Sequence, residues 1–115
     1  MPIENVPPSQ LKQWLDARGT DEGFPLLLDV REPAEWAAAS VHADGAELLQ
    51  WPMQSIPARM HELDPDRPVA VLCHHGARSM QVAMFLQQHG FARVANVAGG
   101  IDAWSLQFDP TVPRY

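Results

Sequence analysis

The chain has 115 residues, of which 46% are hydrophobic and 19% charged, and its formal net charge is −6 at pH 7. This length and composition predict one globular domain over residues 1–115 and exclude a disordered chain or a membrane protein, since no apolar run approaches about 18 residues. The eight lysines and arginines form no cluster, which excludes nucleic acid as a partner.

The first part of the chain alternates between helical and strand-like patterns. Ser9 is the expected N-cap of a first helix that ends at Gly19. The apolar run 26–30 predicts a buried strand, and Pro33 fits the first turn of the helix that follows it.

The rest of the chain continues this alternation. Strands are expected over 46–49, 69–72 and 94–97, and helical segments over 56–63, from Met80 to Gly90 and over 101–106. Gly90 closes the second of these helices, with Phe91 placed for a Schellman contact. The repeated order of strand, helix and strand predicts an α/β fold with a largely parallel sheet.

The single cysteine, Cys73, stands between the strand 69–72 and the loop that leads into the next helix. In open α/β sheets ligands bind beyond the carboxyl ends of strands, where free N–H groups and the helix dipole favour an anion such as a thiolate. Gly76 allows the loop to turn with its N–H groups pointing inward, and Arg78 adds a permanent positive charge. The pattern therefore favours a reactive thiol over a small buried hydrophobic residue, the alternative for a lone cysteine.

The cysteine count also bears on location. One cysteine can form no internal disulfide, which fits a reducing compartment. Residues 1–5 carry neither the basic nor the apolar segment of a signal peptide. We therefore expect a cytoplasmic protein with no membrane partner.

His74 and His75 beside the cysteine raise the alternative of a metal site. Three consecutive residues cannot easily all turn toward one ion, and structural zinc sites prefer spacings such as C-x2-C. We expect no metal here. The two histidines are expected to present their N–H groups inward and their imidazoles outward.

Two classes of enzyme combine a cysteine with backbone N–H groups and an arginine. In a phosphatase the thiolate attacks phosphorus while the arginine holds the phosphate oxygens. In a sulfurtransferase it takes up a sulfur atom and stores it as a persulfide. Phosphatases need the wider C-x5-R loop, whereas Cys73 and Arg78 form C-x4-R, with Ser79 one position further. The tighter loop favours a single sulfur atom and leaves the phosphatase as a minor alternative.

Several residues outside the loop are further candidates. Asp29 and Arg31 follow the end of a strand, and a buried ion pair that orients the cysteine loop is their expected role. The pair Gly99–Gly100 is expected to allow close backbone approach or a positive φ. Trp104 is expected in the core, and Trp51 either at the rim of the site or packed inside.

Four stretches of the chain together resemble the single-domain rhodaneses, a family of sulfurtransferases. They are Leu27–Glu32 with Glu35–Trp36, the loop Cys73–Ser79, the pair Gly90–Phe91, and Val97–Trp104. Their spacing is similar to that of the family and covers nearly the whole chain. The stretch Ala39–Ala46 lacks the family's usual Gly-His pair, and the tail Asp109–Tyr115 is similar to that of rhodanese domains fused to sulfur-carrier-activating enzymes.

The resemblance implies an α/β fold with a five-stranded parallel sheet flanked by helices on both faces. It implies that Cys73 is the nucleophile and carries the persulfide. The implied donor-binding cradle is formed by His74, His75, Gly76, Ala77, Arg78 and Ser79, with Arg78 attracting and orienting the anionic donor. The implied partners are a small sulfur donor such as thiosulfate and a thiol or cyanide acceptor, with no metal and no organic cofactor. A sulfur relay or binding module that serves a partner protein is the alternative.

Overall fold

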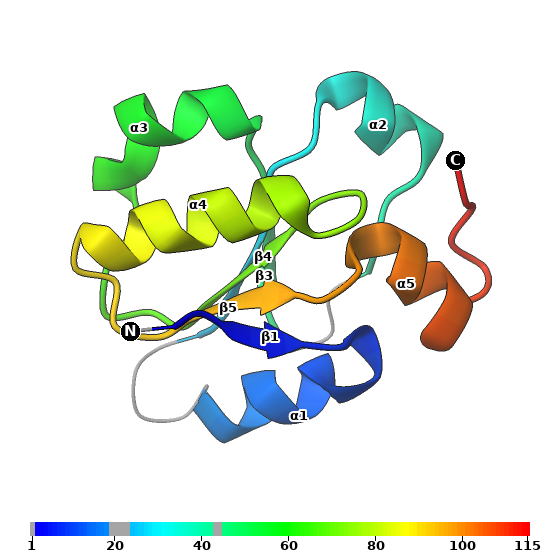
Figure 1. Ribbon diagram of the computed structural model, residues 1–115, viewed down its shortest axis with the longest axis horizontal. Coiled ribbons are helices and arrows are strands. Elements are labelled where there is room, and N and C mark those ends of the chain that lie inside the picture. Colours follow the sequence, from blue (N-terminus) through cyan, green and yellow to red (C-terminus); the bar gives the residue numbers. More distant parts are fainter. Residues whose placement is uncertain (1, 19–23, 43–44) are drawn as a thin grey trace.

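The computed structural model describes residues 2–18, 24–42 and 45–115 and has a five-stranded sheet at its centre (Figure 1). The strands are β1 (Glu4–Val6), β2 (Leu26–Asp29), β3 (Glu47–Gln50), β4 (Val69–Leu72) and β5 (Val94–Val97). They lie in the order β1-β5-β4-β2-β3, and every pairing is parallel. The expected α/β fold with a five-stranded parallel sheet is confirmed.

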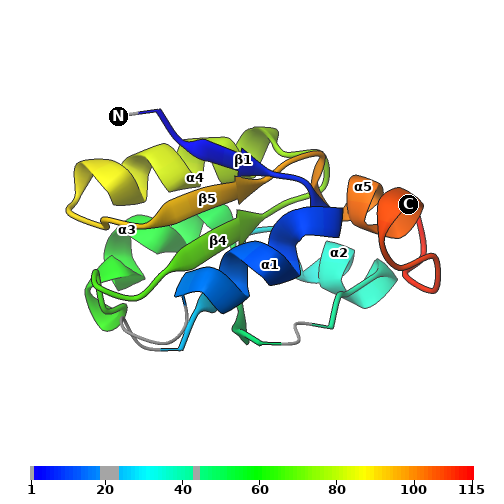
Figure 2. The same ribbon diagram turned by 90° about the horizontal axis from the view of Figure 1, so that it is seen from below.

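Helices cover both faces of this sheet (Figures 1 and 2). They are α1 (Pro8–Arg18), α2 (Pro33–Ala38), α3 (Ile56–Arg59), α4 (Ala77–Gln88) and α5 (Gly100–Gln107), with short 3-10 turns η1 (Met53–Ser55) and η2 (Met60–Glu62) on either side of α3. The helices α1 and α5 pack on one face, and α3 and α4 pack on the other. Within the described ranges, no helix combines the length and the apolar character needed to span a bilayer.

Successive strand residues supply two separate hydrophobic cores. Leu27, Ala70 and Val97 belong to the core under α1 and α5. Leu26 and Val69 belong to the core under α4, as do Leu28 and Val71. Because β2 and β4 are buried on both faces, their sequences are apolar except for Asp29 at the end of β2, and this pattern makes the strands predictable.

The N-terminal part differs from the prediction in two places. The strand β1 was missed, because only Val6 of its three residues is buried and the strand is defined by its pairing with β5. The helix α1 begins at Pro8, so Ser9 lies inside it and is not its N-cap. Proline suits this first helical position because its fixed φ matches the helix and it has no N–H to leave unpaired. The predicted helix end at Gly19 lies outside the described residues.

Two later segments also differ in detail. The helix expected over 56–63 is α3 followed by the turn η2, because the backbone tightens after Arg59 and Leu63 N–H donates to the carbonyl of Met60 at 3.0 Å. In the stretch that departs from the family pattern, residues 43 and 44 lie outside the described residues. The predicted Schellman contact after α4 is confirmed, since Phe91 N–H donates to the carbonyl of Leu86 at 3.1 Å.

Candidate active site

Cys73 directly follows β4, the middle strand of the sheet, and only 1% of its surface is exposed. The next turn leads to α4, whose N-cap is Gly76 with φ +107°. In that conformation, which L side chains rarely adopt, the Gly76 N–H donates to the Cys73 sulfur at 3.0 Å. The predicted inward turn of this loop is confirmed at Gly76.

A second donor reaches the sulfur from the first turn of α4. The hydroxyl of Ser79 lies 3.2 Å from the Cys73 sulfur and 2.5 Å from the Oδ1 atom of Asn96 on β5. Asn96 in turn donates through Nδ2 to the Gly76 carbonyl at 3.2 Å and to Oδ1 of Asn5 at 3.0 Å. The cysteine therefore belongs to a hydrogen-bonded cluster that joins α4 to β5 and β1.

Asn96 is a site residue that the sequence analysis missed. The sequence contains a signal for this residue, because an asparagine interrupts an otherwise apolar buried strand, Val94–Val97. Buried polar side chains are almost always hydrogen-bonded, so such a residue points to a partner group in the interior. The sequence does not reveal that this partner is Ser79.

The N-terminus of α5 holds the cysteine loop from the other side. The N–H of Ile101 donates to the Cys73 carbonyl at 2.8 Å, and the N–H of Asp102 donates to the His74 carbonyl at 3.1 Å. Gly100 has φ +61°, and a Cβ atom there would lie 2.4 Å from the carbonyl oxygens of Cys73 and His74. The expected close backbone approach at Gly99–Gly100 is confirmed.

Arg78 is engaged with a carboxylate of α2. Its Nη1 and Nη2 atoms donate to the two oxygens of Glu35 at 2.6 and 2.9 Å, and a third of the Arg78 side chain is exposed. The hydrogen bonds from Arg78 outweigh burial and lower the pKa of Glu35 from 4.5 to about 2. The same pairing raises the pKa of Arg78. The sequence predicts Arg78 as a residue of the cysteine loop, but it does not indicate that Glu35 is the partner of Arg78.

Asp29 and Arg31 form a buried ion pair, as expected, with both side chains fully excluded from solvent. Arg31 Nη2 donates to Asp29 at 2.8 Å and to the carbonyl of Ala39 at 2.8 Å. Its Nη1 atom donates to the carbonyl of Glu35 and to the hydroxyl of Tyr115. The pair thus fixes α2 directly and reaches the cysteine loop through Glu35 and through Tyr115, which stacks on His74. Its predicted effect on that loop stays a prediction.

The two loop histidines differ in exposure. His75 is 66% exposed at its side chain, as expected, whereas His74 is partly buried between His75 and Tyr115, with ring centroids 3.9 and 4.0 Å away. Tyr115 stacks on His74 and donates its hydroxyl proton to Glu35 at 2.8 Å. The tail thus adds an aromatic contact at the loop that the sequence analysis did not foresee.

His74, His75 and Asp102 offer possible ligand atoms within 4.8 Å of one another. Asp102, however, accepts a hydrogen bond from Arg114 at 2.8 Å, and a neighbouring positive charge opposes a bound cation. The two histidine rings are stacked, and His74 Nε2 is buried with no hydrogen-bond partner among the described residues. The ion pair between Asp102 and Arg114 disfavours a cation at this cluster.

Trp104 and Trp51, the two tryptophans considered in the sequence, are both buried. Trp104 is buried in the core under α1 and α5, as expected. Trp51 belongs to the core under α4, and the guanidinium of Arg59 lies 3.8 Å from its ring centroid. Of the two alternatives for Trp51, packing is confirmed.

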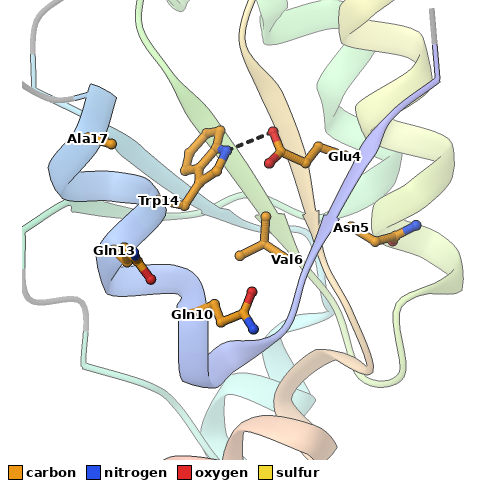
Figure 3. Close-up of a pocket in the computed structure, with 7 residues that line it drawn as sticks. All are labelled: Glu4, Asn5, Val6, Gln10, Gln13, Trp14 and Ala17. Carbon is orange, nitrogen blue, oxygen red and sulfur yellow. Dashed lines mark hydrogen bonds between the residues drawn. The ribbon is translucent and has the colours of Figure 1, made fainter.

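A hollow of about 290 Å³ lies apart from the cysteine loop, between β1 and α1 (Figure 3). Trp14 faces Glu4 there, and its Nε1 atom donates to Glu4 Oε1 at 3.0 Å. No residue from Cys73 to Ser79 lines this hollow. The side chain of Asn5 turns away from it, toward the side of β1 where Asn96 lies (Figure 3).

Comparisons with known proteins point to one family. The sequence pattern of the rhodanese-like domain family matches residues 7–107. A sulfurtransferase of Allochromatium vinosum is 43% identical over 98 residues, which cover 85% of this chain and 88% of that protein. The crystal structure of a rhodanese-related protein from Thermoplasma volcanium matches with a TM-score of 0.75 and 28% identity, covering 97% of this chain and 99% of that one.

Other relatives are much longer than this chain. The probable adenylyltransferase/sulfurtransferase MoeZ of Mycobacterium tuberculosis is 33% identical over 111 residues, which are 96% of this chain and 26% of MoeZ. A chloroplastic rhodanese-like/PpiC domain-containing protein of Arabidopsis thaliana is 44% identical over 89 residues, which are 77% of this chain and 30% of that protein. With the family pattern spanning most of its length and a 43% identical relative of similar size, the chain belongs to the rhodanese-like domain family.

Proposed function

We propose that this protein is a sulfurtransferase that carries sulfur as a persulfide on Cys73. In the first half-reaction the Cys73 thiolate attacks the outer sulfur of a donor such as thiosulfate. A new S–S bond forms, the S–S bond of thiosulfate breaks, and its electron pair leaves with sulfite. In the second half-reaction a thiol or cyanide takes the outer sulfur and the bonding pair returns to Cys73 as thiolate. The charge balances in both steps.

The observation that carries this proposal is the surroundings of the sulfur. The Gly76 N–H and the Ser79 hydroxyl both lie within hydrogen-bond distance of it. Donors aimed at a sulfur stabilise it when it becomes negatively charged. In the proposal, backbone N–H groups of residues 74–79 receive the anionic donor, and the positive charge of Arg78 orients it. The sulfurtransferase name of the 43% identical relative supports the same reaction class.

The phosphatase alternative is disfavoured by the length of the loop. The loop is one residue shorter than the C-x5-R loop of cysteine-dependent phosphatases. Hydrolysis of an aryl phosphate that depends on Cys73 would favour the phosphatase instead.

The proposed function is tested by intact-protein mass spectrometry after incubation with thiosulfate. The wild type is expected to gain about 32 Da, one sulfur atom, and to lose it on addition of cyanide. Cys73→Ser is the matched control and should gain nothing. The proposal is wrong if the wild type shows no adduct or if Cys73→Ser shows the same one. A panel of donors in the same experiment identifies the preferred substrate.

A sulfur relay to a partner protein is the second candidate. It is favoured by the likeness to MoeZ, a protein nearly four times the length matched here and named for two activities. Rapid multiple turnover with small thiols would favour a free-standing enzyme. Stoichiometric loading followed by transfer to one protein would favour the relay. Either role needs a reduced thiol, so we include a cytoplasmic location in the proposal.

A further inference from the structure

We propose that Asn96 is a positioning residue for Cys73, and that it acts by competing with the cysteine sulfur for the single proton of the Ser79 hydroxyl. The inference rests on the proposed role of Cys73 as the nucleophile. It starts from three buried side chains. Ser79 is fully buried, Cys73 is 1% exposed and Asn96 is 3% exposed, so water cannot easily replace a missing partner.

The competition follows from counting protons. The Ser79 oxygen lies 3.2 Å from the Cys73 sulfur and 2.5 Å from Asn96 Oδ1, and a hydroxyl has one proton to donate. The Asn96 amide cannot turn to remove the conflict. Its Nδ2 atom is committed to two acceptors, the Gly76 carbonyl and Asn5 Oδ1, so its oxygen faces Ser79.

The charge on the sulfur decides which acceptor receives the proton. A neutral thiol can donate its own S–H to the Ser79 oxygen, which leaves the hydroxyl proton for Asn96. A thiolate is only an acceptor, so the hydroxyl must turn to it and Asn96 Oδ1 loses its donor. Asn96 therefore favours the states in which the Cys73 sulfur is uncharged.

The persulfide is one of those states. When Cys73 attacks the donor, its sulfur gains a second covalent bond and the negative charge moves to the outer sulfur. The Ser79 hydroxyl is then free to return to Asn96. Asn96 thus stabilises the thiol and the persulfide relative to the thiolate that forms between them, and this favours sulfur uptake once the attack on the donor begins.

The test is a pH titration of Cys73 in the absence of any sulfur donor. The ultraviolet absorbance of the thiolate reports ionisation, and the titration midpoint is the pH at which half of Cys73 is ionised. Ser79→Ala should raise the midpoint by about one pH unit, because the thiolate loses a donor. Asn96→Ala should lower it by about half a unit, because the hydroxyl no longer has a competing acceptor. The double variant should match Ser79→Ala, because Asn96 acts only through that hydroxyl.

The other titratable groups around the cysteine loop are the same in all of these variants. They are Arg78 with Glu35 and Tyr115 behind it, the two loop histidines, and Asp102 on α5. Asn5→Ala is the matched control, since it removes the outer partner of Asn96 Nδ2 and leaves the Oδ1 contact with Ser79. It should leave the midpoint unchanged.

If Asn96 had a merely structural role, Asn96→Ala would raise the titration midpoint of Cys73 instead of lowering it. Loss of its bond to the Gly76 carbonyl would loosen the loop, weaken the Gly76 donor and raise the midpoint. A raised or unchanged midpoint in Asn96→Ala therefore overturns the inference, as does an additive double variant. Asn96→Val, which suits a buried strand, carries the same expectation if the alanine variant does not fold. Because no donor is present, this result is independent of whether thiosulfate loads Cys73.

Discussion

Glu35 shows how a single side chain can join separate parts of the site. It accepts hydrogen bonds from Arg78 on α4, from the Tyr115 hydroxyl and from the backbone N–H of Glu32. These donors hold it as a carboxylate and lower its pKa to about 2. The ionised form of Glu35 therefore contributes to the stability of the fold.

This contribution predicts a specific acid sensitivity. Because the pKa of Glu35 is lowered from 4.5 to about 2 on folding, its stabilisation is present above pH 4.5 and is lost as the pH falls toward 2. Glu35→Gln should therefore be less stable than wild type at pH 7 and lose less stability across that interval. Urea denaturation at a series of pH values measures this.

The control is Glu62→Gln, whose pair with Arg59 is more than 40% exposed on both sides. It should change stability little at any pH, because exposed ion pairs contribute little. Parallel pH curves for Glu35→Gln and wild type would contradict the assigned role of Glu35.

The buried pair of Asp29 and Arg31 predicts a larger effect. Asp29→Asn removes the counter-charge of a fully buried guanidinium, and breaking such a pair costs about 3–5 kcal/mol of unfolding free energy. Asp16→Asn breaks the exposed pair with Lys12 and should cost less than about 0.5 kcal/mol. Chemical denaturation compares the two variants, and equal losses would show that burial does not govern the strength of the pair.

At the scale of whole elements, the contact between α5 and the cysteine loop depends on Gly100. Gly100→Ala adds a Cβ atom 2.4 Å from two carbonyl oxygens and also places alanine at φ +61°. The φ alone costs about 1–2 kcal/mol, and the clash must displace the loop. We expect lower stability together with reduced persulfide loading, measured by denaturation and by intact mass.

Gly90→Ala is the matched control for this prediction. Gly90 also has a positive φ, at +95°, but a Cβ atom there would meet nothing within 4 Å. It should lower stability by about 1–2 kcal/mol and leave persulfide loading unchanged. If both variants load sulfur equally well, the position of the loop does not depend on α5.

The elements differ in how far the sequence predicts them. Buried runs such as Val69–Leu72 carry their own signal, because both faces need apolar residues. β1 has no such signal, since only its pairing with β5 makes Glu4–Val6 a strand. The same holds within the site: Cys73 and Gly76 are local features of one loop, whereas Glu35 lies 43 residues from Arg78 and Asn96 lies 17 from Ser79. Partners brought together by folding cannot be seen in a local pattern.

The whole molecule adds a long-range electrostatic effect. Its formal net charge of −6 repels an anionic reagent, and dissolved salt screens that repulsion. Alkylation of Cys73 by the anion iodoacetate should therefore become faster as salt is raised from low ionic strength. Alkylation by neutral iodoacetamide should not change. A rate for iodoacetate that falls with salt would mean that the positive field of Arg78 and the loop outweighs the net charge.

The pairing of β1 with β5 has a consequence for how the protein is made. A chain leaves the ribosome from its N-terminus, yet Glu4 lies beside Ala95 and the sheet cannot close until the last strand has emerged. The groups that surround Cys73 emerge late as well, since Asn96 and Ile101 both follow it in the sequence. A nascent chain therefore carries an unsheltered thiol from the moment Cys73 emerges until residues 96–101 have followed it, and only then does Cys73 acquire its surroundings.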